Sequence, residues 1–397
     1  MIILGCSGSI GVNALEIAKR FCLEIEVLGA GKNISLLNKQ ISEHHPKAIA
    51  IADAQDIPKI TPAFQGKIYI GKEGILQAIL DSKSKLVLNA LTGFLGLEPT
   101  LCAIHCGKKV ALANKESLVA GGELIDISKI IPIDSEHFSL SYLLGFPKTS
   151  RPFRNLYITA SGGAFRDMDL NEIPHQNALN ALKHPNWQMG KKITIDSATM
   201  VNKLFEILEA YWLFGNKNID AFIERNSHIH ALVEFWDGSV VAHFANANMQ
   251  LPIAYAIQLG LGLPESFLHS FHTNKAIPDS IISQLDFQNK NYQLQKIESA
   301  RYPLWNLKSV LLENPKLGLV LNAANEIAVE AFLQDSISFG TMTQIVQDSM
   351  QTFNKIHFKS KEEMIALDQE VRDYTRRKLY FFIRYFLYYL LIYIFLP

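Results

Sequence analysis

The chain has 397 residues, of which 48% are hydrophobic and 19% are charged. This composition supplies enough apolar surface for two or three folded domains and excludes a largely disordered chain. Lysine plus arginine number 38, and aspartate plus glutamate also number 38, so no overall positive field attracts a nucleic-acid backbone. We therefore expect no nucleic-acid partner, although a local basic cluster can still bind the phosphate of a small molecule.

Cysteine usage and the N-terminus bear on the compartment. The four cysteines form no Cys-x-x-Cys pair and follow neither a metal-ligand nor a disulfide pattern; they are Cys6, Cys22, Cys102 and Cys106. We expect them to be small packed residues in a reducing cytoplasm. The chain starts with the apolar run MIILG, without a basic leader or a small-residue cleavage site, so we expect no signal peptide.

Residues 1–133 alternate short apolar runs with segments of helical length. We expect strands at residues 1–4, 24–30, 47–52, 67–70, 85–91, 109–113 and 130–133. Helical segments lie between several of them, for example at residues 34–43 and 95–105. Nearly continuous apolar strands that alternate with helices predict a parallel sheet covered on both faces, and therefore a Rossmann-like domain.

The pattern changes in residues 134–262. Strands are expected at residues 155–163, 191–197, 228–238 and 239–246. The last two flank Asp237-Gly238, which is a good hairpin turn. One helix is expected at residues 198–214, closed by Gly215. These features predict an α+β domain with an antiparallel or mixed sheet.

The remainder divides into a linker, a helical domain and an unusual tail. We expect a polar linker at residues 263–290, a small helical bundle at residues 291–378 and a hydrophobic tail at residues 379–397. Arg384 leaves about a dozen uninterrupted apolar residues in the tail, fewer than the roughly 20 that a membrane span needs. The tail is a membrane anchor, a helix packed on the bundle, or the product of a shifted reading frame. Membrane contact is expected only through this tail.

The stretch GCSGSIG at residues 5–11 follows the first strand and precedes a helix, which is the context of a dinucleotide-binding turn. Its spacing is Gly-x-x-Gly-x-x-Gly, so a purely structural turn is the alternative. The second strand ends in GAGKN without an acidic residue, and Lys32 and Asn33 suit a 2′-phosphate better than a free ribose hydroxyl. NADP is therefore favoured over NAD, with a solvated surface lysine as the alternative.

Two carboxylates, Asp134 and Glu136, follow the last expected strand of the Rossmann-like domain in IPIDSEHF. If the strand continues through them, side chains at positions i and i+2 point to the same face. Like charges at that distance repel unless a cation lies between them or one carboxylate is protonated. The sequence therefore predicts a cation at this edge of the sheet, with an exposed, solvated pair as the alternative.

The helix expected at residues 198–214 carries Asn202, Lys203 and Glu206 on one face, and Ser197 is expected at its N-cap. A helix start that offers a hydroxyl, an amide and an ammonium group favours phosphate binding. Glu206 would then be a third oxygen ligand. Three carboxylates with no histidine or cysteine among them select Mg²⁺ or Mn²⁺. The alternative is a capped amphipathic helix with an i, i+3 salt bridge.

Three further stretches have the composition of a ligand site. The turn Ser161-Gly162-Gly163 in ITASGGAF is open to an anion. The loop HPNWQMG contains Trp187, which is either a packing anchor or part of a lid. ALANKES ends a parallel strand with Asn114-Lys115-Glu116, at the sheet edge where ligands of open α/β sheets bind.

Together these stretches resemble the 1-deoxy-D-xylulose 5-phosphate reductoisomerase family over about residues 1–375. The resemblance rests on eight motifs in order: GCSGSIG, GAGKN, LANKESLV, PIDSEH, TASGGAFR, HPNWQMG, IDSATMVNK with Glu206, and LNAANE. The tail after Lys378 has no counterpart in the family. The resemblance implies an N-terminal NADPH domain, a central catalytic domain that also forms the interface of a homodimer, and a C-terminal helical domain.

The resemblance also implies residue roles. The residues expected to bind NADPH are Ser7, Gly8, Ser9, Ile10, Gly31, Lys32, Asn33, Asn114, Glu116 and Gly190. The residues expected to bind the sugar phosphate are Lys115, Ser135, Glu136, Ser161, His184, Trp187, Ser197, Asn202, Lys203 and Glu206. The expected metal ligands are Asp134, Glu136 and Glu206. The expected catalytic residues are Lys115, Glu136, His184 and Glu206.

The implied reaction converts 1-deoxy-D-xylulose 5-phosphate to 2-C-methyl-D-erythritol 4-phosphate, in the non-mevalonate route to isoprenoid precursors. A divalent metal assists the isomerisation, by retro-aldol cleavage or by an alkyl shift, and NADPH reduces the resulting aldehyde. Two alternatives are an NADP-dependent dehydrogenase of another sugar phosphate and a regulatory module that senses the nucleotide. A plain dehydrogenase would not need three acids, and a sensor would show no metal requirement.

Overall fold

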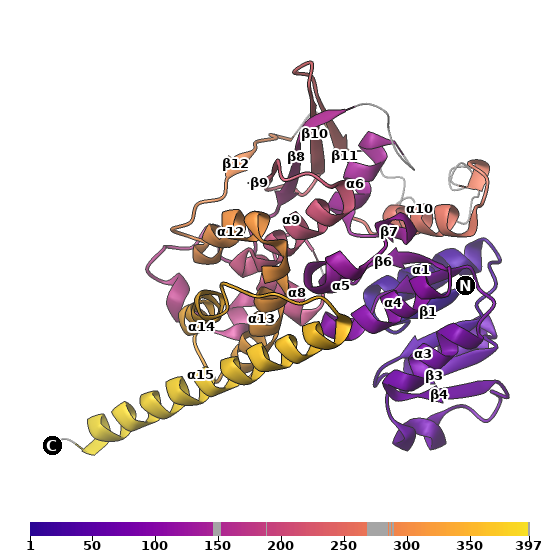
Figure 1. Cartoon of the computed structure of the whole chain (residues 1–397), viewed down its shortest axis with the longest axis horizontal. Helices are drawn as coiled ribbons and strands as arrows, with labels where there is room; N and C mark the ends of the chain where they lie inside the picture. Colours follow the sequence, from indigo (N-terminus) through magenta and orange to yellow (C-terminus); the bar gives the residue numbers. More distant parts are fainter. Residues whose placement is uncertain (146–151, 188, 268–284, 286, 288–289, 396–397) are drawn as a thin grey trace. The chain divides into compact units, whose positions relative to one another are not determined.

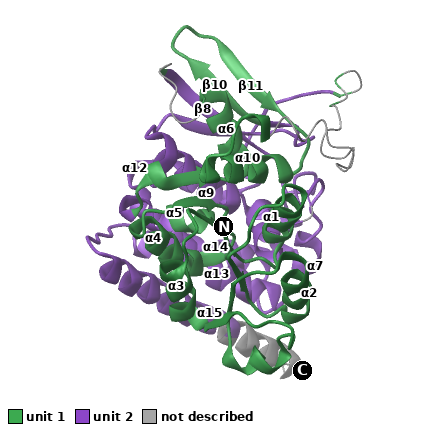
Figure 2. Ribbon diagram, turned by 90° about the vertical axis from the view of Figure 1, so that its right-hand side faces the viewer, with its two compact units in different colours: residues 1–118, 125–152, 230–290 green, residues 119–124, 153–229, 291–397 purple. Residues whose placement is uncertain are grey.

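The computed structural model describes residues 1–145, 152–187, 189–267, 285, 287 and 290–395. The chain forms two compact units, coloured separately in Figure 2. Unit 1 contains Met1–Leu118, Ile125–Pro152 and His230–Lys290, and unit 2 contains Val119–Leu124, Phe153–Ile229 and Asn291–Pro397. Most of the linker predicted at residues 263–290 lies outside the described residues. The domain boundaries drawn from the sequence stay a prediction.

A parallel sheet forms the centre of unit 1, and within the described residues it has seven strands in the order β4-β3-β2-β1-β5-β6-β7. The strands are β1 (Ile2–Leu4), β2 (Val27–Ala30), β3 (Ala48–Ile51), β4 (Lys67–Ile70), β5 (Leu86–Asn89), β6 (Lys109–Leu112) and β7 (Ile130–Pro132). Every neighbouring pair runs parallel, and Ile3 of β1 aligns with Leu28 and Leu88. The predicted Rossmann-like sheet is confirmed.

Helices pack against this sheet because the apolar strands must be covered. The helices that begin in unit 1 are α1 (Ser9–Arg20), α2 (Ile34–His44), α3 (Gly71–Asp81), α4 (Leu97–His105), α5 (Lys115–Gly121), α6 (Ser135–Leu144) and α10 (Gln250–Leu261). Helix α10 contributes Ile253 and Ile257 to the same core as Ile3 and Leu88. The strand order reverses at β1, between β2 and β5, and open α/β sheets bind ligands at the carboxyl ends of the strands at such a point.

A hairpin, which belongs to unit 1 from His230 onward, joins β10 (Ile229–Phe235) to β11 (Val240–Phe244). Gly238 adopts a φ of +81° in the turn, a conformation that favours glycine. The Asp237 carboxylate accepts a hydrogen bond from the backbone N–H of Ser239 at 2.9 Å. The hairpin predicted at Asp237-Gly238 is confirmed, and β11 packs against α6.

Unit 2 contains strands that pair in both directions. Strand β8 (Phe153–Ala160) runs parallel to β9 (Ile219–Ile223), and β9 runs antiparallel to β12 (Gln295–Lys296). Mixed pairing is one of the two alternatives predicted for this region. The short helix α7 (Ala178–Ala181) and the pair α8 (Lys191–Thr199) and α9 (Val201–Phe214) follow β8 in the chain.

The prediction of a strand at residues 191–197 is wrong, because these residues form most of α8. Apolar and polar residues alternate in KKITIDS, which is typical of a strand. The side chains nevertheless form contacts of helical spacing. Lys192 Nζ lies 2.8 Å from the Asp196 carboxylate, and the Ser197 hydroxyl donates to the carbonyl of Ile193. These i, i+4 contacts stabilise the helix that the period-2 pattern concealed.

The helix predicted at residues 198–214 is present but begins later, at Val201. Met200 separates α8 from α9 with a φ of 66°, which ends the first helix. Helix α9 ends at Gly215, which adopts a φ of 64° as a left-handed C-cap, as predicted. Ser197 therefore lies inside α8 and is not the N-cap of the helix that carries Glu206.

The C-terminal part of unit 2 is helical, as predicted. Its helices are α12 (Lys308–Glu313), α13 (Gly318–Leu333), α14 (Phe339–Thr352) and α15 (Lys361–Phe395). Helix α13 is buried along most of its length and packs against both α14 and α15. The contacts of α13 make it the central helix of the bundle.

Helix α15 continues from the bundle into the predicted hydrophobic tail, and Figure 1 draws it as one continuous helix. Leu379 is buried, whereas the Tyr380 and Phe381 side chains are 60% and 67% exposed. Among the described residues, no helix combines the length and the apolar character that crossing a membrane requires.

Candidate active site

The glycine-rich turn of unit 1 joins β1 to α1. A Cβ atom on Gly5, whose φ is +81°, would lie 2.4 Å from the carbonyl oxygen of Ala90. A Cβ atom on Gly11 would lie 2.4 Å from the carbonyl oxygen of Gly5. Both positions therefore require glycine. Gly8 and Ser9 are exposed at the start of α1, where no side chain caps the helix, so the partial positive charge of the helix N-terminus faces outward.

The end of β2 provides a cationic side chain in the same unit. Gly31 and Lys32 are exposed, and a Cβ atom on Gly31 would meet no atom within 4 Å. Asn33 caps α2, and its Oδ1 accepts a hydrogen bond from the backbone N–H of Leu36 at 3.1 Å. The side-chain oxygen of Asn33 is thus used within the protein, while its amide group can still donate to a phosphate.

From the sequence, Lys32 is expected to bind the 2′-phosphate that distinguishes NADPH from NADH. The Lys32→Ala variant is expected to bind NADPH roughly 10-fold more weakly, because one charge-assisted hydrogen bond to the 2′-phosphate is lost. NADH binding should stay within about 2-fold, since NADH has no phosphate there. Fluorescence titration of both nucleotides measures this difference, and an equal loss for both would contradict the assignment.

Asn114 organises the loops at the carboxyl edge of the sheet. Its amide nitrogen donates to the carbonyl oxygens of Gly93 at 2.8 Å and Leu91 at 3.0 Å, and it also contacts the Glu116 carboxylate. Its Oδ1 accepts from the backbone N–H and the hydroxyl of Ser117. Asn114 is 1% exposed and uses its side chain inside the protein, so a role toward the cofactor would be one of positioning.

The start of α6 corrects the prediction for the two acids. Strand β7 ends at Pro132, Asp134 is the N-cap of α6, and Glu136 lies in the first turn. The Asp134 Oδ1 atom accepts a hydrogen bond from the backbone N–H of Glu136 at 3.2 Å. The two carboxylates therefore do not share the face of a strand. A helix start accommodates both because its free N–H groups and partial positive charge stabilise carboxylates.

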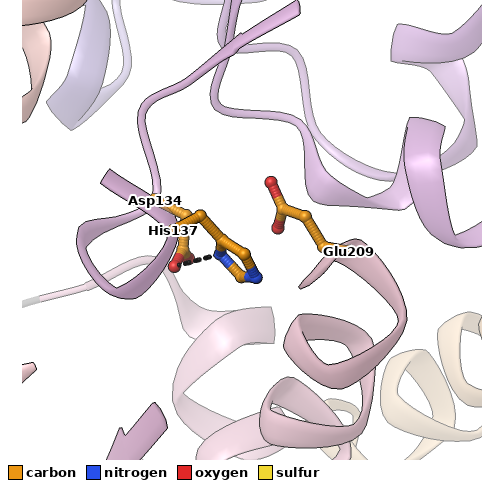
Figure 3. Close-up of side chains that lie close together, drawn as sticks. All are labelled: Asp134, His137 and Glu209. Carbon is orange, nitrogen blue, oxygen red and sulfur yellow. Dashed lines mark hydrogen bonds and ion pairs between the residues drawn. The ribbon is translucent and has the colours of Figure 1, made fainter. Parts of the chain in front are cut away.

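Asp134 also holds two basic side chains of unit 1. Lys115 Nζ lies 2.5 Å from Asp134 Oδ2, and His137 Nδ1 lies 2.9 Å from Asp134 Oδ1. Figure 3 shows the His137 ring turned toward Asp134; Glu209, also drawn, belongs to unit 2. His137 was missed by the sequence analysis because residues three apart meet on a helix but not on a strand. The expected strand concealed this partner.

Helix α9 of unit 2 brings together the polar residues that the sequence placed on one face. Asn202 Nδ2 donates to Glu206 Oε1 at 2.5 Å, and Lys203 Nζ forms an ion pair with Glu206 Oε2. Lys203 is 3% exposed and Glu206 is 1% exposed. A buried carboxylate needs such partners, because an isolated charge is costly to remove from water. The predicted common face is confirmed.

The turn Ser161-Gly162-Gly163 lies against the end of α8. A Cβ atom on Gly163, whose φ is +68°, would lie 2.7 Å from the carbonyl oxygen of Ser197. Arg166, which the sequence analysis did not single out, donates to the carbonyl of Ser161 at 2.8 Å. It follows TASGGAF directly, so its place in that motif is the signal that could have identified it.

Ser161 and His184 form a hydrogen-bonded pair in unit 2. The Ser161 Oγ atom lies 2.8 Å from His184 Nε2 and also accepts from the backbone N–H of Gly163. His184 Nδ1 accepts from the backbone N–H groups of Trp187 at 2.9 Å and Asn186 at 3.2 Å. Nδ1 is therefore unprotonated, and Nε2 carries the hydrogen and donates to Ser161. The Ser161 hydroxyl hydrogen can then point toward an anion.

Burial lowers the pKa of His184 from 6.5 to about 4, and the positive charge of Arg166 adds to the effect. The folded protein thus binds less proton than the unfolded chain between these values. The free energy of unfolding gained from the neutral ring is complete above pH 6.5 and decreases as the pH falls toward 4. Chemical denaturation of the wild type and of His184→Gln should show a smaller loss over this range in the variant. Equal losses would contradict this account.

The other expected residues of this loop are described in part. Trp187 is half-buried and donates its backbone N–H to His184, whereas Gln188 lies outside the described residues. Gly190 is the N-cap of α8, and a Cβ atom there would meet no atom within 4 Å. The lid and packing interpretations of Trp187 both stay predictions.

The chemistry of each unit is consistent with a phosphate-carrying ligand. Unit 1 offers an uncapped helix start, an exposed lysine and two carboxylates at one helix start. Unit 2 offers a serine paired with a neutral histidine, and a buried ammonium group beside a carboxylate. These groups bind anions, donate hydrogen bonds and hold cations.

Comparison with known families agrees with these features. Three family models match the chain in order. The model described as 1-deoxy-D-xylulose 5-phosphate reductoisomerase matches residues 1–122, the model of its C-terminal domain matches residues 130–214, and a DXP reductoisomerase C-terminal domain model matches residues 244–374. The matched ranges contain every residue described in this subsection.

Individual relatives match over nearly the whole chain. The 1-deoxy-D-xylulose 5-phosphate reductoisomerase of Wolinella succinogenes is 52% identical, over 95% of this chain and 100% of that protein. A solved DOX-P reductoisomerase in complex with NADPH, fosmidomycin and magnesium has a TM-score of 0.84 and 31% identity, over 95% of this chain and 97% of its own. The 1-deoxy-D-xylulose 5-phosphate reductoisomerase from Zymomonas mobilis, solved in complex with NADPH, has a TM-score of 0.81 and 30% identity, over 95% of this chain and 98% of its own. The chain belongs to the 1-deoxy-D-xylulose 5-phosphate reductoisomerase family.

Proposed function

We propose that this protein isomerises 1-deoxy-D-xylulose 5-phosphate and reduces the product with NADPH to 2-C-methyl-D-erythritol 4-phosphate, as a step of isoprenoid precursor synthesis. The observation that carries the proposal is 52% identity to a reductoisomerase along 95% of the chain. The Rossmann-like sheet with its glycine-rich turn supports the NADPH half of the reaction. The paired Ser161 and His184 support recognition of a phosphate.

The donor set of the proposed metal site fits Mg²⁺ or Mn²⁺. We assign Asp134, Glu136 and Glu206 as ligands, since hard divalent cations prefer carboxylate oxygens. Asp134 and Glu206 each hold a lysine ammonium group, so both carboxylates lie where positive charge is stabilised. When bound, the metal ion would supply Lewis-acid stabilisation of negative charge on substrate oxygens. Solved relatives in complex with magnesium support the choice of a divalent metal ion.

The side chains of unit 2 would bind and orient the substrate phosphate. The assigned residues are Ser161, His184, Ser197, Asn202 and Lys203. The neutral His184 ring donates to the Ser161 oxygen, which leaves the hydroxyl hydrogen of Ser161 available to the phosphate. Binding energy from the phosphate, which does not react, can then hold the reacting carbons in place.

The remaining assignments concern the substrate's sugar end and the cofactor. Lys115 is held by Asp134, so its ammonium group is fixed at the start of α5. We assign Lys115, Ser135 and Glu136 to the substrate, and Trp187 to a segment that closes over it. We assign to NADPH the same residues that the family motifs imply: Ser7, Gly8, Ser9, Ile10, Gly31, Lys32, Asn33, Asn114, Glu116 and Gly190. The protein is proposed to act as a homodimer in the cytoplasm, and light scattering at twice the chain mass tests the dimer.

The proposed function is tested by following NADPH absorbance with the purified full-length chain. Oxidation is expected only when 1-deoxy-D-xylulose 5-phosphate and Mg²⁺ or Mn²⁺ are both present, and chelation of the metal should stop it. A dehydrogenase of another sugar phosphate would oxidise NADPH with a different substrate and without added metal. Binding of NADPH without any turnover would indicate the regulatory module instead.

A further inference from the structure

A chain of hydrogen bonds in unit 1 links strand β11 to the first turn of α6. The Ser139 hydroxyl donates to the backbone carbonyl of Ser135 at 2.7 Å. The same hydroxyl lies 2.8 Å from Nδ1 of His243 on β11. Ser139 is 1% exposed, so water does not compete for these contacts. The three residues connect segments separated by about a hundred positions in the sequence.

The direction of these hydrogen bonds follows from elementary chemistry. A carbonyl oxygen can only accept, so the single hydroxyl hydrogen of Ser139 is used on Ser135. The ring of His243 must then donate from Nδ1 to the Ser139 oxygen. Burial lowers the pKa of His243, which favours the neutral ring, and the contact with Ser139 places the ring N–H on Nδ1. The relay therefore runs from the His243 ring through Ser139 to the Ser135 carbonyl.

The ring is also held by aromatic packing against α6. The His243 ring centroid lies 5.7 Å from that of Phe138 at 88°, and 5.3 Å from that of Tyr142. The edge-to-face contact with Phe138 restricts the orientation of the ring. A serine that bonds to the carbonyl four residues earlier does not stabilise a helix by itself. The His243 N–H fixes the orientation of the hydroxyl, so β11 contributes to holding this turn.

The turn that the relay holds carries Asp134, Ser135 and Glu136. We infer that His243, acting through Ser139, is a positioning residue that fixes this turn for metal binding. The inference rests on the proposed function, which assigns Asp134 and Glu136 as ligands. Residues that orient metal ligands without contacting the ion change the affinity for the metal, typically by about 10–100-fold. His243 was not identified from the sequence, because nothing in the sequence pairs it with Ser139.

A cavity of about 460 Å³ in unit 1 makes this relay open to chemical rescue. Ser135, Ser139 and His243 line it, together with Phe244 and Phe287 among others. Free imidazole has the size and the donor of the missing ring, so it can enter the space left by His243→Ala. Rescue by a small molecule distinguishes a lost hydrogen bond from a misfolded strand.

The relay is tested on the full-length chain without substrate, by Mn²⁺ titration followed by electron paramagnetic resonance. His243→Leu and Ser139→Ala are each expected to weaken Mn²⁺ binding roughly 10-fold. The double variant should bind Mn²⁺ no more weakly than either single variant, because each substitution alone already breaks the same relay. His243→Asn keeps a donor near the Nδ1 position and should stay within about 2-fold. Free imidazole should restore Mn²⁺ binding in the His243→Ala variant.

Phe244→Leu is the matched control, since Phe244 lines the same cavity but takes no part in the relay. It should bind Mn²⁺ like the wild type, and thermal denaturation checks that each variant is folded. Equal Mn²⁺ affinity in His243→Leu and the wild type would overturn the inference. So would an equal loss in Phe244→Leu, which would indicate general packing.

Hydrogen exchange separates the relay from the metal assignment. Backbone amides of residues 135–139 should exchange faster in His243→Leu than in the wild type, and as in the wild type in His243→Asn. If the wild type bound no Mn²⁺ at all, the metal assignment would be wrong. Hydrogen exchange of residues 135–139 would still test the relay. Unchanged exchange in His243→Leu would overturn the relay whatever the metal result.

Discussion

Replacing Glu206 by glutamine is expected to lower turnover of 1-deoxy-D-xylulose 5-phosphate about 10³-fold, because several kcal/mol of metal-assisted charge stabilisation are lost. Glutamine keeps the shape and the hydrogen bond from Asn202. It removes the charge that Lys203, and in our proposal a divalent metal, requires. Steady-state NADPH oxidation across a Mn²⁺ titration measures both the turnover and the metal dependence.

Glu98→Gln is a suitable control for this experiment, since Glu98 lies in the first turn of α4, outside the assigned site. It should retain wild-type turnover and metal dependence. Binding of NADPH should be unchanged in both variants, because the nucleotide is assigned to the glycine-rich turn. Full activity of Glu206→Gln with unchanged Mn²⁺ affinity would refute the ligand role.

Replacing Lys203 by methionine is expected to lower the free energy of unfolding by about 3 kcal/mol or more, since it leaves a buried carboxylate without its cation. Lys203 and Glu206 are 3% and 1% exposed, so solvent cannot compensate. Urea denaturation of the metal-free protein, compared with the wild type, gives this value from the shift of the midpoint.

The double variant Lys203→Met/Glu206→Gln provides the corresponding test. With the charge on Glu206 removed, the loss caused by Lys203→Met should become smaller, and the difference is the coupling energy of the pair. Additive losses would show that the two side chains act independently. That outcome would contradict the ion pair described on α9.

Much of the fold of unit 1 was predictable because its strands are buried on both faces. Strand β4 occupies the predicted residues 67–70, and β7 lies within residues 130–133. The prediction was wrong at residues 191–197. Polar and apolar residues alternate in KKITIDS as in a strand, but i, i+4 contacts between side chain and side chain or carbonyl stabilise a helix there. The local sequence pattern predicts secondary structure well where an element is buried on both faces. It predicts less well where contacts between side chains determine whether a segment is a helix or a strand.

The candidate site was predictable where a motif ties residue type to spacing. Asn202, Lys203 and Glu206 share a helix face, so their contacts followed from periodicity alone. Asp134 and Glu136 were identified, but the local structure was mistaken, and His137 was missed for that reason. The role of Asn114 depends on carbonyls of a loop about twenty residues earlier, and no spacing rule reveals such tertiary contacts.

The most direct test of the central claim is a diffraction experiment on crystals soaked with Mn²⁺ and NADPH, using anomalous scattering from manganese. The account predicts one strong manganese peak per chain, bonded to carboxylate oxygens of Asp134, Glu136 and Glu206 at the distances typical of hard divalent cations. No peak, or a peak bonded to other residues while these three carboxylates lie apart, would contradict it.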